Sequence, residues 1–209
     1  MGSEWGGSFK SFQAMRLLPD VIRSLKRVGC DTPTAVQQEA IVPLLHHRDI
    51  IVEAEVGSGV TTAYAAAVLQ LCDRRSNFVQ AVIATASYPY AEKIYNIMKR
   101  LAHYRSLNIH LCGSGPSIEI EKRDLAAAPV HIVIGSASKI HSMAHSSQIR
   151  LSTATIFIVD KTNEVFARNL QESLLSLSRY VSSRAQYGFF SETMPKQMDA
   201  FVAKLDLKC

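Results

Sequence analysis

Short apolar runs alternate with amphipathic stretches along most of this 209-residue chain. The apolar runs are rich in Val, Ile and Phe and nearly continuous in hydrophobicity, a pattern typical of strands covered on both faces of a sheet. They predict strands at Asp49–Glu53, Val79–Thr85, Leu107–Cys112, Val130–Gly135, Thr155–Asp160 and Gln186–Phe190. Between them apolar residues recur at i, i+3 and i+4 spacing, as on one face of a helix. This spacing predicts helices at Thr61–Cys72, Tyr90–Tyr104, Leu170–Tyr180 and Lys196–Leu205.

Two further helices are predicted before the first strand. Phe12–Val28 has one apolar face and is followed by Gly29, a residue that commonly ends a helix. The turn Asp31–Thr34 supplies a cap for a second helix that runs through Gln37 to Leu44. Strands that alternate with helices predict an α/β fold, with a parallel β-sheet, right-handed crossovers and helices on both faces.

Composition is that of an ordinary globular domain, with 47% hydrophobic and 20% charged residues. We expect residues 1–8 to be an expression tag or flexible leader, and residues 9–209 to form one domain. No apolar run approaches the roughly 18 residues of a membrane span, so no membrane partner is expected. The formal net charge of +5 is compatible with RNA as a partner, although no dense Lys/Arg run marks a patch.

The cysteines and histidines give no sign of a metal centre. The four cysteines lie far apart without CxxC spacing or histidine partners, which favours reduced thiols and no metal site. The pairs His46–His47 and His141/His145 are interpreted as surface residues. Reduced thiols fit a protein of the cytoplasm, including its ribonucleoprotein granules. They also fit a nuclear protein.

A glycine-rich loop follows the first predicted strand and precedes a helix. Gly57, Ser58 and Gly59 occupy a position where backbone N–H groups point at a bound phosphate. A Walker A loop also has a lysine directly before its Ser/Thr, but here Val60 precedes Thr61. This segment alone leaves both a phosphate loop and a plain glycine turn open.

The surrounding segments resemble the motifs of DEAD-box RNA helicases, and of their initiation-factor branch most of all. Thr32–Ile41, with its double glutamine, is similar to the Q motif of that family, and the glycine loop to its motif I. The later motifs follow in order at Ala86–Ala91, Cys112–Gly115, Ser136–Lys139, Asp160–Asn163 and Ser191–Pro195. The resemblance covers about residues 9–209 and implies the first RecA-like domain. The second RecA-like domain, which supplies arginine fingers in the family, is expected to be absent.

The resemblance implies roles for individual residues, which we expect to be vestigial here. Gln37 would read the adenine edge, and Thr61 and Asp160 would face a magnesium ion. The loop residues Gly57, Ser58, Gly59, Val60 and Thr61 would surround the phosphates.

Several of these positions depart from the family pattern. Val60 stands for the phosphate lysine and Lys161 for the glutamate that orients the attacking water. Cys30 replaces the aromatic residue that would stack on adenine, and Glu192 replaces an alanine.

These departures predict a degenerate helicase domain without ATPase or unwinding activity. Phosphoryl transfer depends almost entirely on positioning and charge neutralisation, and both are lost when a lysine is missing and a carboxylate becomes an ammonium. We therefore expect no catalytic residue, no bound metal, and no ATP or magnesium cofactor. An alternative is an active ATP-dependent RNA helicase domain in which Lys161 replaces the missing lysine and ATP and magnesium are used. A third interpretation is an unrelated structural domain that has a similar glycine loop.

The expected role is RNA binding, protein interaction or both. By position in the family motifs, Tyr88, Gly113, Gly115, Ser136 and Lys139 would face RNA. Tyr88 either stacks on a base or is a plain surface tyrosine. RNA binding is expected to be weak and sequence-tolerant, with protein partners in ribonucleoprotein complexes. Similar degenerate cores occur in Tudor-domain helicase-like proteins of germline small-RNA pathways, which would place this domain in a longer protein.

Overall fold

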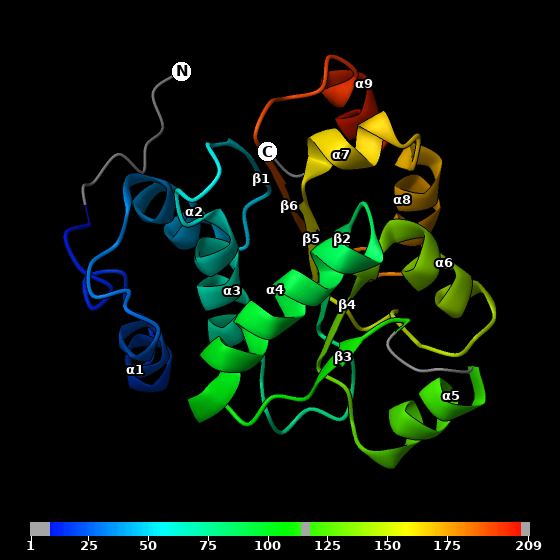
Figure 1. The fold of residues 1–209 in the computed structure, drawn as a ribbon, viewed down its shortest axis with the longest axis horizontal. Coiled ribbons are helices and arrows are strands. Elements are labelled where there is room, and N and C mark those ends of the chain that lie inside the picture. Colours follow the sequence, from blue (N-terminus) through cyan, green and yellow to red (C-terminus); the bar gives the residue numbers. More distant parts are fainter. Residues whose placement is uncertain (1–8, 114–117, 206–209) are drawn as a thin grey trace.

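The computed structural model describes residues 9–113 and 118–205, and its six strands form one parallel sheet (Figure 1). The order across the sheet is β1-β6-β5-β2-β4-β3, and all five strand pairs are parallel. The strands are β1 (Ile50–Glu53), β2 (Ala81–Thr85), β3 (Ile109–Leu111), β4 (Ile132–Ser136), β5 (Ile156–Asp160) and β6 (Gln186–Ser191). The predicted fold class and all six predicted strands are confirmed.

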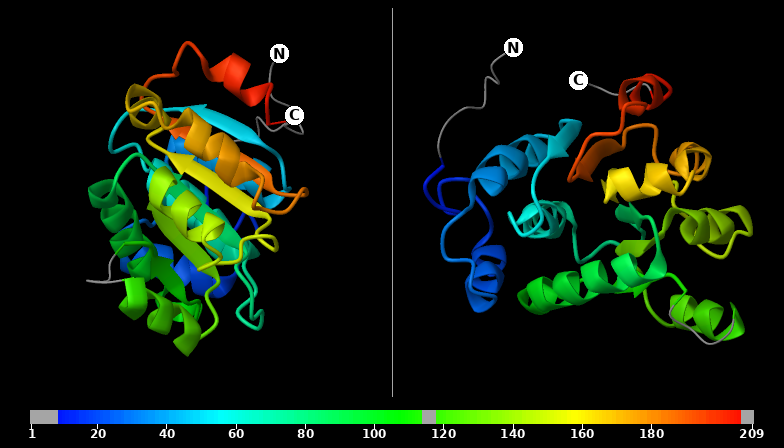
Figure 2. Two further views of the ribbon diagram at one scale, coloured as in Figure 1. Left: turned by 90° about the vertical axis from the view of Figure 1, so that its right-hand side faces the viewer. Right: turned by 45° about the horizontal axis from the view of Figure 1, so that its top comes forward.

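Helices cover both faces of the sheet (Figures 1 and 2). One face carries α1 (Pro19–Arg27), α2 (Ala35–Leu45), α3 (Val60–Leu71) and α4 (Tyr88–Leu101), which η1 (Ala102–Tyr104) extends. The other face carries α6 (Ala137–His145), α7 (Thr162–Ala167), α8 (Gln171–Ser178) and α9 (Met198–Val202). α5 (Ile118–Ala127) follows β3 and lies near that edge of the sheet. Within the described residues, no helix has the length and apolar character that crossing a membrane requires.

The sheet separates two hydrophobic cores. Because successive side chains of a strand point to opposite faces, Ala81 and Ile83 of β2 pack into the core under α1–α4. Val82 and Ala84 of the same strand pack into the core under α6–α9. Both faces of the central strands are therefore buried, which explains why the strands appear in the sequence as continuous apolar runs.

The N-terminal helix is shorter than predicted. Phe12–Val28 was expected to be one helix, but α1 begins only at Pro19. Arg16 has a positive φ of 59°, which interrupts any helix before it, and Pro19 suits the first turn, where no backbone donor is needed. The predicted end of the helix is confirmed, since Gly29 has a φ of 82° and its N–H bonds to the carbonyl of Lys26.

Three helices, α5, α6 and α7, were not among those predicted. They have ten, nine and six residues, so each offers fewer than three turns in which a periodic pattern can show. α6 and α7 also start directly after the strands β4 and β5, with Ser136 and Lys161 as their respective N-caps. Each therefore begins with short or polar residues directly after an apolar strand, and too few apolar positions follow to show a helical period.

The carboxyl ends of the strands collect the motif-bearing segments at one edge of the sheet. The loop after β1 carries the glycines, Tyr88 follows β2, and Ser136 ends β4. Lys161 follows β5 and Glu192 follows β6. In open α/β sheets ligands bind at this edge.

The N-terminal cap of α2 is hydrogen-bonded to the glycine loop. Thr34 Oγ1 accepts a hydrogen bond from the Gln37 N–H at 3.4 Å, and Gln37 Oε1 accepts one from the Thr34 N–H at 3.1 Å. The Thr34 hydroxyl also donates to the carbonyl of Ser58 at 2.8 Å. The predicted cap is therefore present as a capping box that also holds the loop.

Replacing Thr34 by alanine is expected to lower the free energy of unfolding by about 1 kcal/mol, because the N-cap acceptor and the bond to the loop are both lost. Urea denaturation of the purified chain measures the change. Thr34→Ser keeps the hydroxyl and is the control, expected to unfold close to the parent midpoint. Equal loss in both variants would show that the methyl group, not the hydroxyl, stabilises this turn.

Candidate nucleotide pocket and nucleic-acid interface

The glycine loop turns tightly between β1 and α3. Gly57 and Gly59 both have positive φ, 84° and 94°, and Gly59 is the N-cap of α3. The Ser58 N–H and hydroxyl both bond to the carbonyl of Glu55, which closes the turn. The first backbone N–H groups of a helix have no intrahelical partners, so this loop and the start of α3 form a cradle for an anion.

Opposite the loop, residues at the ends of β5 and β6 complete a cavity of about 290 Å³. The sequence-predicted residues that line this cavity are Gly57, Gly59, Val60, Thr61, Asp160 and Lys161. Ser58 does not line it and instead bonds to Thr34 and Glu55. The two halves of the expected nucleotide site therefore meet in space, although about 100 residues separate them in sequence.

Gln37 supports the loop in this structure. It is buried, its Nε2 donates to the Gly59 carbonyl at 3.2 Å, and its Oε1 accepts from Thr34. A Cβ at position 59 would lie 2.4 Å from Gln37 Nε2, so the close approach requires a glycine there. The expected contact of Gln37 with adenine stays a prediction. Cys30 packs, partly buried, against the core nearby.

Asp160 is buried at the end of β5 and is held by hydrogen bonds on both oxygens. The Tyr64 hydroxyl donates to Oδ2 and the Lys161 N–H to Oδ1, each at 2.8 Å. Burial raises the pKa of Asp160, and the bonds from Tyr64, Lys161 and the Thr61 hydroxyl oppose that rise. Thr61 and Asp160, the two expected magnesium-facing groups, are therefore in contact.

Tyr64 is a site residue that the sequence prediction missed. It lies in α3 between alanines and is fully buried. Burial, and then the charge of Asp160, raise the pKa of its phenol well above the usual value, so it stays a hydrogen-bond donor. A buried tyrosine in an otherwise apolar helix needs a hydrogen-bond partner for its hydroxyl. A tyrosine among the alanines of this helix could therefore have indicated a buried polar partner.

The charges in the cavity differ from those of a typical phosphate site. Lys161 is the one basic side chain among the described residues that line it, and its Nζ forms an ion pair with Glu192 Oε1. Glu55 and Asp160 add two further carboxyl groups. Val60, at the first position of α3, packs partly buried against the core and adds no charge.

A second group of predicted residues meets beyond β2 and β4. A Cβ on Gly113 would lie 3.6 Å from Tyr88 Cδ2 and 3.7 Å from Lys139 Cε, so these residues are neighbours. Ser136 caps α6 and accepts from the Lys139 N–H at 3.3 Å. We name Tyr88, Gly113, Ser136 and Lys139 the Tyr88 surface. Gly115, the fifth predicted RNA residue, lies outside the described residues.

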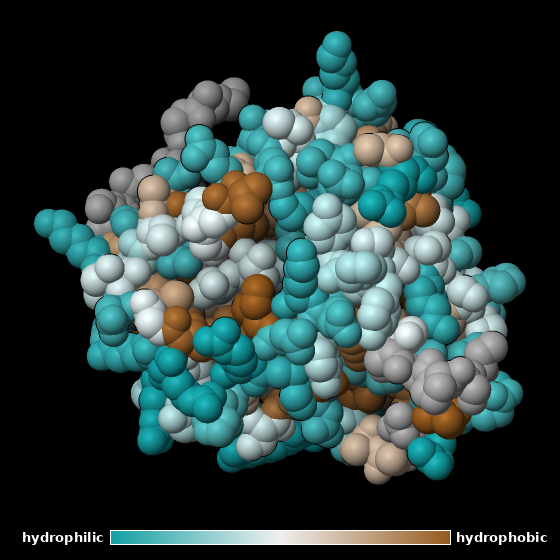
Figure 3. Space-filling view, in the orientation of Figure 1, coloured by the Kyte–Doolittle hydropathy of each residue, from teal (hydrophilic) through white to brown (hydrophobic). Residues whose placement is uncertain are grey.

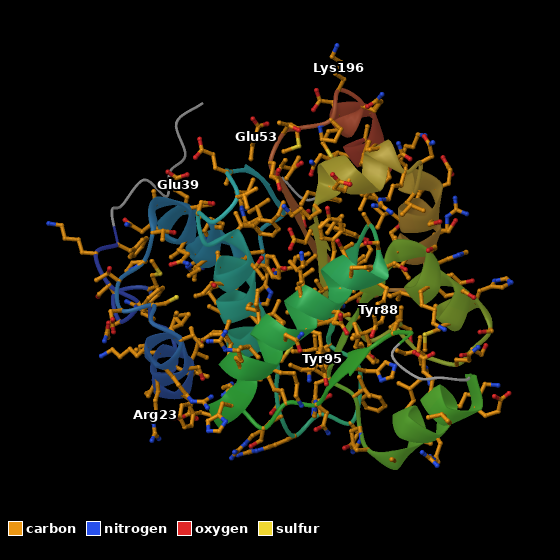
Figure 4. All side chains as sticks on the ribbon, viewed as in Figure 1. Arg23, Glu39, Glu53, Tyr88, Tyr95 and Lys196 are labelled. Atoms are coloured by element: carbon orange, nitrogen blue, oxygen red, sulfur yellow. The ribbon has the colours of Figure 1, made fainter. Side chains whose placement is uncertain are left out.

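Tyr88 is 36% exposed and lies at the end of α4 that faces the tip of β3 (Figure 4). Its hydroxyl donates a hydrogen bond to Glu92 Oε1 one helical turn away, at 3.4 Å. The side of the molecule that carries α4 is mostly hydrophilic, with small separate hydrophobic patches (Figure 3).

Lys139 of the Tyr88 surface is paired with a buried carboxylate. Its Nζ lies 3.0 Å from Oε2 of Glu121, a residue of α5 that is 2% exposed. Burial alone would raise the pKa of Glu121, but the Gly113 N–H and the Lys139 ammonium outweigh burial and hold that pKa below its usual value. Sequence patterns gave no signal for Glu121, because its partners come from other segments.

Comparison with known proteins decides the family. The family model for DEAD/DEAH box helicases matches residues 34–201, most of the chain. The chain belongs to this family. The DEAD-box domain is 29% identical over 189 residues to eukaryotic initiation factor 4A-8 of Nicotiana tabacum, covering 90% of the chain and 46% of that protein. Initiation factor 4A of Zea mays is also 29% identical, over 188 residues. The chain therefore spans about half the length of these relatives.

Solved structures agree with the RecA-like fold of the DEAD-box domain. A DEAD-box protein from the hyperthermophile Methanococcus jannaschii matches with a TM-score of 0.88 at 21% identity, over 94% of this chain and 54% of that one. Dbp5 of S. cerevisiae, bound to RNA and ADP BeF3, matches with a TM-score of 0.84 at 18% identity. That match covers 94% of this chain and 50% of Dbp5.

The expectation that no nucleotide cofactor is used is wrong by these comparisons. The family model and the initiation factor 4A relatives place the chain among the DEAD-box helicases, a family of ATP- and magnesium-dependent proteins. The expectation rested on the side chains at positions 60 and 161 alone. It gave too little weight to the backbone cradle of Gly57 and Gly59, which is preserved.

Replacing Tyr64 by phenylalanine is expected to destabilise the DEAD-box domain by about 1.5–3 kcal/mol at neutral pH, because a charged buried carboxylate loses its donor. The folded-state pKa of Asp160 is raised above the unfolded value, so ionised Asp160 costs stability, and that cost grows as the pH rises through the folded-state pKa. Without the phenol the cost is larger. The difference in free energy of unfolding between the parent chain and Tyr64→Phe should therefore shrink as the pH falls.

Urea denaturation between about pH 8 and pH 5 measures this difference. Tyr95→Phe removes a phenol on α4 that forms a cation–π contact with Lys99, and it serves as the control with little expected effect. A loss of stability in Tyr64→Phe that does not change with pH would mean that the bond is made to a neutral carboxyl group.

Proposed function

We propose that this domain binds RNA through the Tyr88 surface and holds a nucleotide in a pocket that does not support efficient hydrolysis. The observation that carries the proposal is the meeting of Tyr88, Gly113 and Lys139 at one edge of the sheet. An aromatic ring beside a half-buried glycine and an ammonium group suits a single-stranded nucleic acid, although the Gly113 N–H and the Lys139 ammonium are also bonded to Glu121. The RNA in the Dbp5 structure supports the same ligand class for this fold.

Loss of hydrolysis follows from the chemistry of the cavity. Lys161 stands where the family resemblance expects a carboxylate that orients water, and an ammonium group has no lone pair with which to accept a proton. Val60 leaves the phosphates without the charge of a lysine. Each missing group of this kind typically costs about 10²–10³ in rate, and the two act on the same step.

Nucleotide binding is supported separately from hydrolysis. The positive-φ glycines, the first turn of α3 and the contact between Thr61 and Asp160 are all present. These features suit a di- or triphosphate with a magnesium ion, and the ADP BeF3 of the Dbp5 structure supports them. We therefore propose an adenine nucleotide with magnesium as the pocket's occupant.

A second candidate function is an active RNA-dependent ATPase. The observation that favours it is that Lys161 lines the same cavity as the glycine loop, from where its ammonium group would supply the charge that Val60 lacks. The ion pair with Glu192 opposes this role, because it neutralises Lys161 in the structure. Steady-state hydrolysis by the unaltered chain distinguishes the two functions.

The setting we propose is a ribonucleoprotein complex in which the domain is part of a longer protein, in the cytoplasm or nucleus. Structures of related Dbp5 chains bound to Gle1 and to Nup159 support protein partners for domains of this fold. A domain that binds RNA and protein without consuming ATP would act as a clamp or scaffold, and not as a motor.

Replacing Lys139 by alanine is expected to weaken binding of single-stranded RNA and to reduce the salt slope of the affinity by about 0.7, the share of one phosphate contact. Fluorescence anisotropy with an oligouridylate at several salt concentrations measures both. Lys26→Ala changes the net charge equally on α1 and is the control. An unchanged slope in the Lys139 variant, or an equal change in both variants, would mean that RNA does not contact the Tyr88 surface.

Val60→Lys is expected to tighten binding of Mg-ADP but not to restore ATP hydrolysis. The new lysine neutralises phosphate charge, whereas Lys161 still cannot accept the proton of an attacking water. The double variant Val60→Lys, Lys161→Glu is expected to show at most a trace of activity. In the family each arginine from a second domain is worth about 10³ or more in rate.

Calorimetry and phosphate release with saturating RNA are the two measurements. Val60→Met adds side-chain length without charge and is the control for the gain in affinity. Rapid turnover by Val60→Lys alone would show that Lys161 does not occupy the water-orienting position, and the proposed role of the domain would then fail.

A further inference from the structure

Three side chains that are typical metal ligands come together beside β3, away from the nucleotide pocket. They are His110, Cys112 and Glu121, and their ligand atoms all lie within 4.8 Å of one another. His110 and Cys112 are two residues apart on the β3 segment, so their side chains point to the same face. Glu121 reaches that face from α5. The prediction that no cysteine has a histidine partner overlooked this alternation.

The cluster is mostly buried, and His110 is its most exposed member. Cys112 and Glu121 are almost fully buried, at 1% and 2% exposure, while the His110 side chain is 11% exposed. The Glu121 carboxylate already has partners in Lys139 and the Gly113 N–H, so the observation that points to a metal is the gathering of three different ligand atoms, a thiol, an imidazole nitrogen and a carboxylate oxygen, at one place. The partly exposed imidazole gives an ion a route from solvent.

We propose that His110, Cys112 and Glu121 form a binding site for one zinc ion. In tetrahedral zinc sites, bond lengths of about 2.0–2.3 Å place neighbouring ligand atoms about 3.3–3.7 Å apart. His110 Nε2 and Glu121 Oε1 are already 3.3 Å apart. Since all three ligand atoms lie within 4.8 Å of one another, the sulfur needs to approach by at most about 1.5 Å.

The mixture of ligand atoms selects the metal. Nitrogen and sulfur ligands suit zinc, while calcium and magnesium take oxygen ligands almost exclusively. Zinc displaces the proton of the Cys112 thiol to solvent, and the thiolate and the Glu121 carboxylate, which Lys139 also contacts, supply the negative charge that faces the ion. Three protein ligands leave the fourth position for a water molecule on the exposed side of His110.

Groups around the cluster already orient the carboxylate for this purpose. The Gly113 N–H donates to Glu121 Oε1 at 2.6 Å, and Lys139 Nζ lies 3.0 Å from Oε2. An oxygen atom of a carboxylate has two lone pairs, so Oε1 can keep the Gly113 bond while it binds the metal. Such outer partners hold metal ligands in position in known sites.

Zinc at this position would fix the Gly113 segment and α5 relative to Lys139. Two of these residues, Gly113 and Lys139, belong to the Tyr88 surface, so the metal would stiffen the proposed RNA interface from behind. The zinc site itself does not depend on RNA binding, because its ligands lie in the protein and its test needs no RNA.

The test is a titration of the whole chain, prepared without a polyhistidine tag and stripped of metal, with cobalt(II) and then zinc. One equivalent of cobalt is expected to give tetrahedral d–d bands and a thiolate-to-cobalt charge-transfer band, which zinc then abolishes. Competition with a chromophoric chelator gives the zinc affinity. Cys72→Ser is the control, because Cys72 is equally buried but is not one of the three clustered residues.

Cys112→Ser is expected to lose the charge-transfer band and to weaken zinc binding by more than about 100-fold, the upper range for loss of an outer-shell partner. If that variant does not fold, Glu121→Gln is used in its place. Glu121→Gln is expected to keep the charge-transfer band but to bind zinc at least about 10-fold more weakly. The proposal is overturned if the parent chain binds no stoichiometric zinc. It is equally overturned if the Cys112 or Glu121 variant binds zinc as tightly as the Cys72 control.

Discussion

Parallel pairing of the six strands is the constraint on which the rest of the structure depends. Each parallel connection must cross a face of the sheet before the next strand begins, so every strand starts at one edge and ends at the other. The loop after β1, the start of α4, the cap of α6 and the residues after β5 and β6 therefore share one edge. Both candidate sites, the nucleotide pocket and the Tyr88 surface, are built from these segments.

The shape of the nucleotide pocket does not depend on the charges of the side chains that line it. Its shape comes from backbone features, namely the positive φ of Gly57 and Gly59 and the bonds that Gln37 makes behind the loop. None of these needs a lysine at position 60. Asp160 is likewise held by Tyr64 and by the N–H of Lys161, whatever the side chain of Lys161 is. The backbone of the pocket therefore does not depend on the side chains at positions 60 and 161, so the fold and the chemistry of this domain need separate tests.

Sequence patterns predicted the sheet well because both faces of its strands are buried, so that each strand is a continuous apolar run. They failed where a local backbone feature overrode the pattern. The apolar residues of Phe12–Val28 have helical spacing, yet Arg16 and Pro19 delay the helix. In the sites, the ordered motifs located the pocket lining and four residues of the Tyr88 surface. They gave no indication of Tyr64 or Glu121, because a side-chain partner distant in sequence has no periodic signature.

The close approach of Gly59 to Gln37 has a consequence for how this pocket can change by mutation. Any larger residue at 59 would meet the amide of Gln37 and would also have to adopt a φ of 94°, which side chains with a Cβ disfavour. Position 60 has no such restriction, since its side chain packs partly buried at the start of α3. The two neighbouring positions therefore differ in mutational freedom: a side chain at 59 would meet both the Gln37 amide and an unfavourable φ, and a smaller residue at 37 would relieve only the first, whereas position 60 meets neither restriction.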